Sequence, residues 1–317
     1  MAHRILITGV SGGLGALIAR RLDEDGTLPP GDSSANQTKG TPITLIGLDL
    51  VRSRRRWRRL AFVRADLRKP SVVDQIRELE PDIVLHFAVC VTSAHLHPRQ
   101  AHETNVVGTM NLLAGCRSAR RVVAESSGAV YPVNSDTPSV LQEDDASPPT
   151  RQSRAAADLL AVEGMLADLA VANPAREVVV LRFGTILGPT WTGPLASHLR
   201  QGAPPSVMGY DPRLQLLGID DAVDAAARAA SGPHTGLFNV GGRGTVLLSW
   251  LTRLGSLPAG PLLPPLPGTF LAGQAYRLFT GHRPSPELMT LLRVGQVLDS
   301  SRLERRTGWR PRSSTRE

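Results

Sequence analysis

The fold follows from one stretch near the start of the sequence, Thr8-Gly9-Val10-Ser11-Gly12-Gly13-Leu14-Gly15. It comes directly after an apolar run and opens a helical pattern. In a turn of this spacing, one glycine permits the tight bend, one lets the main chain approach a diphosphate, and one lets helix and strand pack closely. The helix N-terminus adds free N–H groups and a positive dipole end. The stretch therefore predicts a dinucleotide-binding turn with contacts from Gly9, Ser11, Gly12, Gly13, Leu14 and Gly15.

Short apolar runs alternate with helical patterns through the first half of the chain, which is typical of βαβ units and a parallel sheet. The runs predict strands over residues 4–8, 43–48, 61–64, 83–87, 121–125 and 178–183. The helical patterns predict helices over residues 14–22, 71–79, 103–116 and 153–169. We therefore expect an α/β fold, with a Rossmann-type doubly wound parallel sheet and a smaller C-terminal substrate-binding lobe.

The length of 317 residues and a hydrophobic share of 41% suit one such body with a smaller lobe. We expect the dinucleotide-binding domain over residues 1–189 and 216–240, and the substrate lobe over residues 190–215 and 241–317. Within the lobe, residues 193–207 and 264–279 carry few charges beyond Arg200 and Arg277. The substrate pocket is therefore expected to be apolar.

The net charge of +8 raises the question of nucleic-acid binding. Only Lys39 and Lys69 are lysines, and the arginines are scattered apart from one run at residues 52–59, so nucleic acid is not an expected partner. Cys90 and Cys116 form neither a disulfide framework nor a metal-ligand pattern, so we expect a cytoplasmic protein without a metal. No export signal is evident, and no stretch reaches the roughly 18 consecutive apolar residues of a membrane helix. The oligomeric state stays open.

Two features after the second predicted strand bear on the choice of cofactor. Asp49 ends that strand, where a carboxylate accepts hydrogen bonds from ribose hydroxyls and favours NADH. Arg52 begins the arginine run, which would bind the 2′-phosphate of NADPH. The sequence therefore leaves NADPH or NADH open.

These features and the motifs after them resemble the extended, epimerase/dehydratase-like branch of the short-chain dehydrogenase/reductase superfamily, over nearly the whole chain. The resemblance implies adenine contacts from Asp66 and Leu67. The run Ser126-Ser127-Gly128-Ala129-Val130-Tyr131 is similar to the family's catalytic stretch, with Ser127 at the catalytic position and Ser126 beside it. The remaining implied cofactor-site residues are Phe87, Ala88, Val89 and Asn105. Further landmarks are Leu181-Arg182-Phe183, Gly188-Pro189, Ile219-Asp220-Asp221 and Phe238-Asn239-Val240-Gly241-Gly242.

The family's acid/base pair, a tyrosine four residues before a lysine, is missing. Counting forward from Ser127 puts its positions at Thr150 and Arg154, and no tyrosine-x-x-x-lysine pair occurs anywhere in the sequence. A threonine hydroxyl is far too weak an acid to replace a phenol. Arg154 stays protonated, so we expect it only to hydrogen-bond the nicotinamide ribose. Oxidation of a sugar alcohol needs the missing base, whereas reduction of a ketone needs a hydride and a stabilised oxyanion.

We therefore predict an NAD(P)H-dependent ketoreductase that reduces a carbonyl of an aromatic polyketide, with Ser127 or Ser126 donating a hydrogen bond near that carbonyl. A phenol of the substrate would supply the proton. This combination resembles the angucyclinone ketoreductase type of aromatic polyketide pathways, as in simocyclinone biosynthesis. Thr92, Ser93 and His95 are predicted substrate contacts. The alternatives are a non-enzymatic NAD(P)-sensing regulator, and a sugar-nucleotide epimerase or dehydratase that uses a different base.

Overall fold

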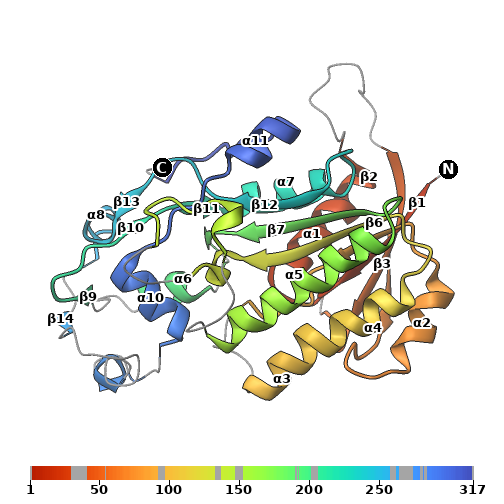
Figure 1. Cartoon of the computed structure of the whole chain (residues 1–317), viewed down its shortest axis with the longest axis horizontal. Helices are drawn as coiled ribbons and strands as arrows, with labels where there is room; N and C mark the ends of the chain where they lie inside the picture. Colours follow the sequence, from red (N-terminus) through yellow and green to blue (C-terminus); the bar gives the residue numbers. More distant parts are fainter. Residues whose placement is uncertain are drawn as a thin grey trace.

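The centre of the molecule is a parallel sheet with helices on both faces (Figure 1). The computed structural model describes residues 2–29, 41–53, 55–91, 97–132, 137–146, 153–189, 191, 193–200, 206–257, 262–263, 274–278, 281 and 284–315. The parallel strands, in spatial order, are β4 (Leu60–Arg64), β3 (Thr41–Asp49), β1 (His3–Thr8), β5 (Ile83–His86), β6 (Arg121–Ser127), β7 (Glu177–Phe183) and β12 (Gly236–Val240). The short β2 (Thr27–Leu28) pairs antiparallel with the start of β3. The predicted α/β fold is confirmed, and β12 extends the sheet beyond the strands that the sequence predicted.

The order of the strands fixes where a ligand would bind. From β1 the chain crosses to β3 and β4 on one side, and then returns to pair β5 with the other side of β1. In a doubly wound sheet this reversal opens a crevice at the carboxyl ends of the central strands. Gly9 and Phe87 follow directly on β1 and β5, so both lie at that crevice.

Helices cover the two faces as the alternation of apolar side chains requires. Leu6 of β1 packs in the cluster on one face, and its neighbours Ile5 and Ile7 pack in the cluster on the other. The first face is covered by α2 (Val72–Leu79), α4 (Gly108–Gly115) and α5 (Arg154–Ala172), and the second by α1 (Gly13–Asp25), α7 (Ile219–Ala229) and α11 (Ser301–Thr307). The helix expected over residues 103–116 is a π-helix, η1 (Glu103–Val107), that runs into α4 and follows α3 (Pro98–His102).

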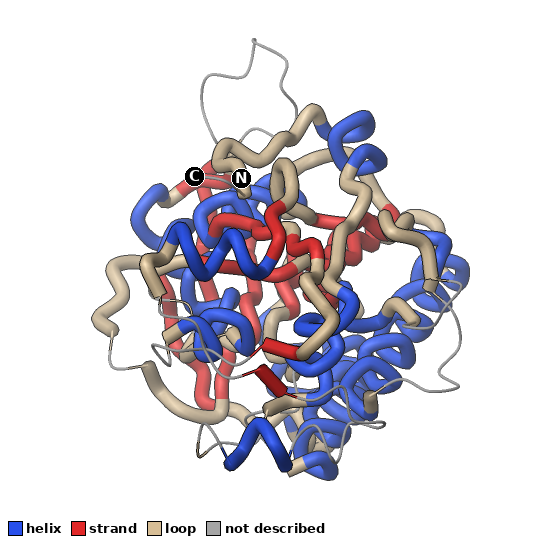
Figure 2. The backbone as a smooth tube through the Cα atoms, turned by 90° about the vertical axis from the view of Figure 1, so that its left-hand side faces the viewer, coloured by secondary structure: helices blue, strands red, loops and turns tan. Residues whose placement is uncertain are grey.

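A smaller lobe with its own apolar cluster lies beyond the carboxyl ends of the strands (Figures 1 and 2). Leu195, Leu214, Tyr276 and Leu292 are buried in that cluster. Its elements are α6 (Pro194–Leu199), α8 (Leu248–Leu254), α10 (Pro286–Val294), and the paired strands β9 (Ser206–Val207) with β14 (Leu262–Leu263) and β10 (Arg213–Leu214) with β13 (Val246–Leu247). Another pair, β8 (Thr185–Leu187) with β11 (Leu216–Gly218), continues from β7.

Residues of the last helix and the segment after it pack against the sheet and not against the lobe. Leu303 of α11 and Trp309 after it belong to the same cluster as the strands and α7. The division expected from the sequence assigned all of residues 241–317 to the lobe. The structure differs because the chain passes through the lobe and then returns to the sheet. We propose that residues 301–309 are counted with the dinucleotide-binding domain.

A buried ion pair fastens α5 to β6 and β7. The guanidinium of Arg182 on β7 donates to Glu163 on α5 through Nε to Oε1 at 2.8 Å and through a terminal nitrogen to Oε2 at 2.6 Å. Ser126 of β6 donates its hydroxyl to Oε1 of the same carboxylate at 2.6 Å. The side chains of the pair are 4% and 7% exposed, so each charge depends on the other for compensation.

Substitution of Glu163→Gln should lower the free energy of unfolding by about 3 kcal/mol, because it leaves the Arg182 guanidinium buried without a counter-charge. Denaturant unfolding measures this change. The matched control is Asp25→Asn, which removes the exposed ion pair with Arg21 and should change stability by about 0.5 kcal/mol or less. Equal effects of the two substitutions would show that the buried pair does not carry this role.

Candidate active site

Main-chain crowding explains two of the three spaced glycines after β1. Gly9 has a φ of +79°, and a Cβ added to it would lie 2.6 Å from the carbonyl oxygen of Phe87. A Cβ on Gly15 would lie 2.5 Å from the carbonyl oxygen of Gly9. Gly12 differs, because a Cβ there would meet nothing within 4 Å. The turn is therefore closed where β1, α1 and β5 meet and open over Gly12.

The open side of the turn fits a diphosphate. Helix α1 begins after Gly12 without a side-chain cap, and its first turn holds no acidic residue. Its N–H groups and dipole are thus available to an anion. Gly13 has a φ of +57°, also with nothing within 4 Å of an added Cβ, and Leu14 anchors the helix by its burial in the core. These residues fit the dinucleotide that the sequence predicted.

Asp49 is held where a ribose would be recognised. Its Oδ2 accepts a hydrogen bond from the N–H of Ser11 at 2.9 Å, and Oδ1 accepts from the N–H of Val51 at 3.4 Å. The Ser11 hydroxyl donates to the carbonyl of Val51. The end of β3 is therefore tied to the glycine turn, and the remaining lone pairs of the carboxylate are free to accept from ribose hydroxyls.

Three arginines of the run at residues 52–59 make local contacts. The guanidinium of Arg52 stacks over the ring of Phe62 at 5.9 Å, and Arg55 forms an ion pair with Glu24 at 2.7 Å. The Arg59 guanidinium donates to the carbonyl of Asp23 at 2.6 Å. Asp49, beside this run, would repel a 2′-phosphate. Use of NADPH through Arg52 therefore stays a prediction.

Asp66 and Leu67 lie beside Asp49, as the motif implies. The N–H of Ala65 donates to the carbonyl of Asp49 at 3.0 Å. Arg68 binds the Asp66 carboxylate with two guanidinium nitrogens at 2.9 and 2.8 Å and holds its pKa below the ordinary value. Leu67 is buried, and its carbonyl accepts from the Asn111 side chain at 2.8 Å. Both positions are thus fixed at the strand edge predicted for the adenine.

A buried neutral histidine positions the segment Phe87-Ala88-Val89. The hydroxyl of Thr8 accepts from the N–H groups of Phe87 and Ala88, both at 3.2 Å, so its own proton is directed to Nδ1 of His86 at 2.8 Å. Nε2 of His86 then donates to Thr109 at 2.9 Å. Burial lowers the pKa of His86 to about 4, so the ring stays neutral. The network locks the ends of β1 and β5 together under the predicted nicotinamide site.

Asn105 positions the main chain next to this segment. In η1 it is fully buried, and its side-chain oxygen accepts from the N–H of Cys90 at 2.7 Å. Its amide nitrogen donates to the Cys90 carbonyl at 3.1 Å. This reciprocal pair uses one donor and one acceptor of Asn105, so we assign it a positioning role rather than the direct cofactor contact implied by the family motif.

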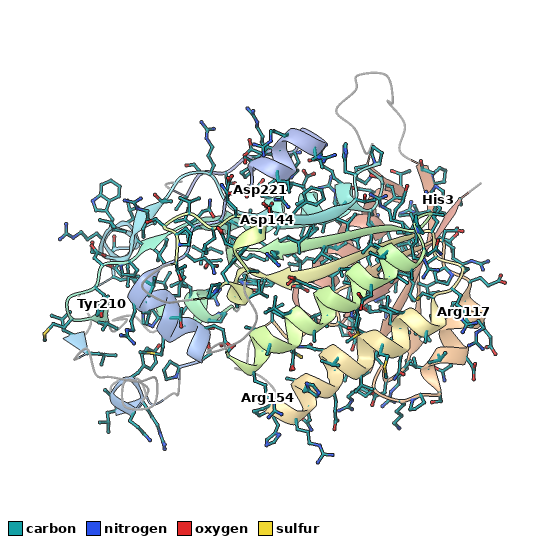
Figure 3. The ribbon with its side chains drawn as sticks, in the orientation of Figure 1. His3, Arg117, Asp144, Arg154, Tyr210 and Asp221 are labelled. Atoms are coloured by element: carbon teal, nitrogen blue, oxygen red, sulfur yellow. The ribbon has the colours of Figure 1, made fainter. Side chains whose placement is uncertain are left out.

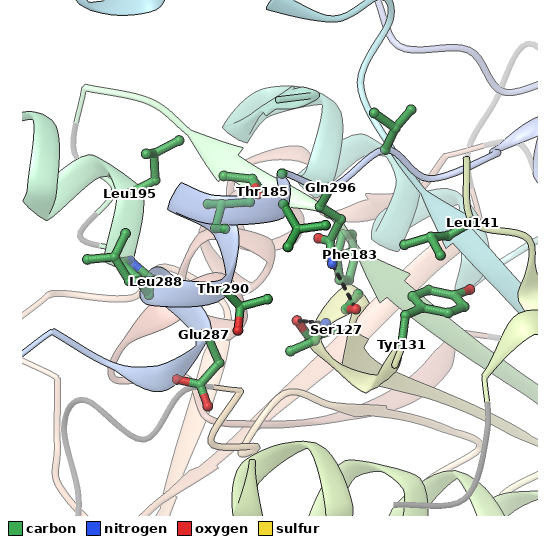
Figure 4. A pocket seen from close by; sticks show the side chains of 18 of the residues that line it. Ser127, Tyr131, Leu141, Phe183, Thr185, Leu195, Glu287, Leu288, Thr290 and Gln296 are labelled. Carbon is green, nitrogen blue, oxygen red and sulfur yellow. Dashed lines mark hydrogen bonds between the residues drawn. The ribbon is translucent and has the colours of Figure 1, made fainter. Parts of the chain in front are cut away.

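The two serines of β6 face opposite sides of the sheet. Ser126 points to α5, where its hydroxyl is bound to Glu163, so the structure gives it a role in the interior. Both serines contribute to the wall of a pocket, and the hydroxyl of Ser127 is not bound to Glu163 (Figure 4). The Ser127 oxygen accepts from the N–H of Ala129 at 3.2 Å, which leaves its proton free to be donated. The catalytic assignment therefore rests on Ser127 alone.

The structure does not bring Arg154 into the site. Arg154 lies in the first turn of α5 with an exposed side chain (Figure 3). The buried face of the helix carries Ala155 and Leu159, four residues apart, and Leu159 packs with Tyr131 in one cluster. The assignment of the family's pair to Thr150 and Arg154 stays a prediction. Thr150, and the predicted substrate contacts Thr92, Ser93 and His95, lie outside the described residues.

The pocket has a volume of about 730 Å³ and lies between the ends of β6 and β7 and the lobe. Its wall carries apolar side chains, with Phe183, Trp191 and Leu195 among its residues. Residues 193–195 belong to a segment expected to line the pocket, whereas the described residues 274–278 of the other expected segment do not line it. The polar side chains from the lobe include Asp211, Arg213, Glu287, Thr290 and Gln296. Residues 287–297 of α10 and the segment after it were not predicted to line the site.

Gln296 links the lobe to the serine turn, and sequence reasoning missed it. Its amide donates to the carbonyl of Gly128 at 2.8 Å (Figure 4). A Cβ on Gly128 would lie 2.7 Å from the Gln296 amide oxygen, so a glycine is required there for this approach. The contact spans 168 positions of sequence, and no local pattern signals it.

Glu125 is the second residue that the sequence did not single out. It lies on β6 before the serines, lines the pocket and is 6% exposed. Burial raises its pKa to about 8. Its place in the sequence could have identified it, because Glu125 precedes Ser127 by two positions and residues two apart point to the same face of a strand.

No helix in the described ranges is long and apolar enough to cross a membrane. Histidine, cysteine and acidic side chains within those ranges form no cluster of three that would hold a metal ion.

Substitution of Gly12→Ala should leave the thermal unfolding temperature unchanged but weaken NADH binding at least about tenfold, because the new methyl group occupies space meant for the diphosphate. Gly15→Ala should lower the unfolding temperature as well, because its methyl group collides with the carbonyl of Gly9. NADH fluorescence titration and thermal unfolding measure the two effects. Unchanged NADH binding by Gly12→Ala would contradict the assignment of the turn.

Comparison with known proteins agrees with this geometry. Residues 5–241 match the NAD dependent epimerase/dehydratase family. An uncharacterised protein of Mycobacterium tuberculosis is 31% identical over 99% of this chain and 81% of its own length. UDP-glucose 4-epimerase 3 of rice (Oryza sativa subsp. japonica) is 28% identical over 68% of this chain and 60% of its own length. The structure of UDP-glucose 4-epimerase from Thermotoga maritima with UDP-glucose has a TM-score of 0.73 at 19% identity, over 98% of this chain and 94% of that one. The chain therefore belongs to the NAD dependent epimerase/dehydratase family, a family of NAD-dependent enzymes.

Proposed function

We propose that this protein is an NAD(P)H-dependent ketoreductase that transfers hydride to a carbonyl of an uncharged aromatic substrate. The observation that carries the proposal is the composition of the pocket beside Ser127. A hydroxyl free to donate stands at its wall, and a turn that fits a dinucleotide lies two strands away in the same sheet. The sequence has no tyrosine-x-x-x-lysine pair, so the family's usual acid/base is absent. A site with a hydrogen-bond donor and no strong base suits reduction better than oxidation of an alcohol.

The charges of the pocket support an uncharged substrate. Asp211 and Glu287 line it, and Arg213 is the basic side chain among its described lining residues. A nucleotide diphosphate carries two negative charges and needs several donors or cations. Phe183 and Trp191 offer aromatic faces to a flat ring system instead.

Tyr131 does not replace the missing tyrosine, although it lines the same pocket. Its hydroxyl donates to Asn239 at 2.6 Å and accepts from Arg182 at 3.0 Å, which fixes it in the buried network of α5 and β7. Burial raises its pKa above the ordinary value. A phenol in this position serves the fold rather than proton transfer.

Ketone reduction also needs a proton for the carbonyl oxygen. A phenol beside the carbonyl of the substrate polarises it through an internal hydrogen bond and is one source of that proton. Aromatic polyketides of the angucyclinone kind have this arrangement, which supports them as a substrate class. A carboxyl group in the pocket is the other source.

A sugar-nucleotide epimerase or dehydratase is the second candidate. It is favoured by the UDP-glucose 4-epimerases among the similar proteins and by Arg213 in the pocket. It needs a base that removes the proton of a sugar hydroxyl. An NAD(P)-sensing regulator is the third candidate, and it requires cofactor binding without turnover.

With NADH or NADPH, the protein should oxidise the cofactor in the presence of aromatic ketones that carry a neighbouring phenol, and it should not interconvert UDP-glucose and UDP-galactose. Absorbance of the reduced nicotinamide and chromatography of the sugar nucleotides measure the two reactions. Ser127→Ala should lower kcat about 100-fold, because a donor to the developing oxyanion is lost. Thr150→Val should leave kcat unchanged.

Three outcomes would overturn this proposal. Interconversion of the UDP-sugars would establish the epimerase, and tight cofactor binding without any turnover would establish the sensor. Loss of turnover in Thr150→Val, with cofactor binding intact, would show that the family's acid/base position is still in use.

A further inference from the structure

Strand geometry places Glu125 and Ser127 on the same face of β6. Side chains alternate along a strand, so residues two apart point the same way and lie about 7 Å from each other. The neighbouring residues confirm which side chains of β6 share a face. Ala124 packs in the cluster that covers one face, and Ser126 binds α5 on that same side. Val123 packs in the cluster of the opposite face. Glu125 therefore points with Ser127, and both line the 730 Å³ pocket.

Among the residues that the structure describes, the carboxyl of Glu125 has no partner that would keep it ionised. Within the described residues it makes neither a hydrogen bond nor an ion pair, and it is 6% exposed. The same-strand neighbour Ser126 has its Glu163 partner. A buried carboxyl that nothing compensates holds its proton, and the pKa of Glu125 is accordingly raised to about 8.

The charged and titratable groups around Glu125 leave this proton in place. On β7, Leu181 is its register partner, and the adjacent Arg182 points to Glu163 on the other face. After β5, burial raises the pKa of Cys90 to about 11, and the charges of Glu125 and of Asp158 on α5 raise it further. Asp158 is paired with His102 at 2.7 Å.

We propose that Glu125 donates the proton to the carbonyl oxygen that is reduced beside Ser127, in place of the family's tyrosine. This inference rests on the proposed function and names the acid of the same site. It moves the proton source from the substrate to the protein. The reaction then extends to ketones without a neighbouring phenol.

The step balances without a further reactant. The carbonyl carbon gains the hydride that a reduced nicotinamide supplies when bound, and the π pair of the C=O bond moves to oxygen. The Ser127 hydroxyl donates a hydrogen bond to that oxygen. An O–H bond forms there as the O–H bond of Glu125 breaks, which leaves an alcohol, an oxidised nicotinamide and a carboxylate. The carboxylate recovers its proton from water.

The pH dependence follows from the protonated form being the active one. For ketone reduction, kcat/KM should be constant at lower pH and fall tenfold per pH unit above about 8. The pKa of this carboxyl is 4.5 in the unfolded chain and about 8 in the folded protein. The neutral carboxyl therefore stabilises the folded state fully below pH 4.5, and this stabilisation is lost as the pH rises from 4.5 to 8. Glu125→Gln has the same shape but cannot ionise, so it removes the pH dependence of kcat/KM and the pH dependence of stability that Glu125 causes.

The test compares wild type with Glu125→Gln, Glu125→Asp and the control Glu78→Gln, whose glutamate is exposed on α2. We expect Glu125→Gln to bind NADH within threefold of wild type and to lose at least 100-fold in kcat for a ketone without a phenol. Glu125→Asp should recover part of that loss. In the cofactor-free protein, Tm of Glu125→Gln should exceed that of wild type increasingly from pH 5 to pH 8, whereas Glu78→Gln should show no such trend.

The results separate the two proposals. A constant Tm difference across this range overturns the role of Glu125, and so does turnover by Glu125→Gln within threefold of wild type. Turnover that survives Glu125→Gln but is lost on methylation of a substrate phenol also overturns it and establishes the substrate as the acid. Absence of any ketone reduction by wild type overturns the proposed function and the role of Glu125 together.

Discussion

The approach of Gly15 to the carbonyl of Gly9 is the constraint on which the rest of the structure depends. It lets α1 start directly over β1, and the same crowding brings Gly9 against the end of β5. Three elements therefore meet at one point of the sheet, the point where the strand order reverses. The Thr8–His86–Thr109 network then fixes this junction from below with uncharged hydrogen bonds. Any side chain on either glycine would separate the helix from the sheet.

Much of this architecture is encoded locally and could be predicted. The strands of the sheet read as apolar runs because both faces are covered, and the glycine turn has a spacing set by main-chain contacts. Asp49 and Ser127 were predictable since each stands at the end of such a run. The outward orientation of Arg154 was not predictable, because counting from Ser127 gives its position along the chain but not the direction of its side chain.

The lobe side of the site could not be predicted because distant residues form it. Gln296 reaches the serine turn across 168 positions, and α10 supplies a wall that no motif marks. Glu125 illustrates a different limit. A glutamate at the end of an apolar strand reads as the polar residue that ends it, and only the burial around it shows that it is kept neutral. In the role proposed for Glu125, the site replaces the family's acid while the scaffold of the family is kept.

The contact between Gln296 and Gly128 also has a consequence for protein synthesis. The turn that carries Ser127 is completed by a residue that is synthesised 168 positions after Gly128. Leu141 makes its bridge to Leu298 in the same late segment. While the ribosome still holds these residues in its tunnel, the nascent sheet is already long enough to form its glycine turn. The glycine turn can thus form early in translation, whereas the serine turn is completed only after Gln296 has left the tunnel.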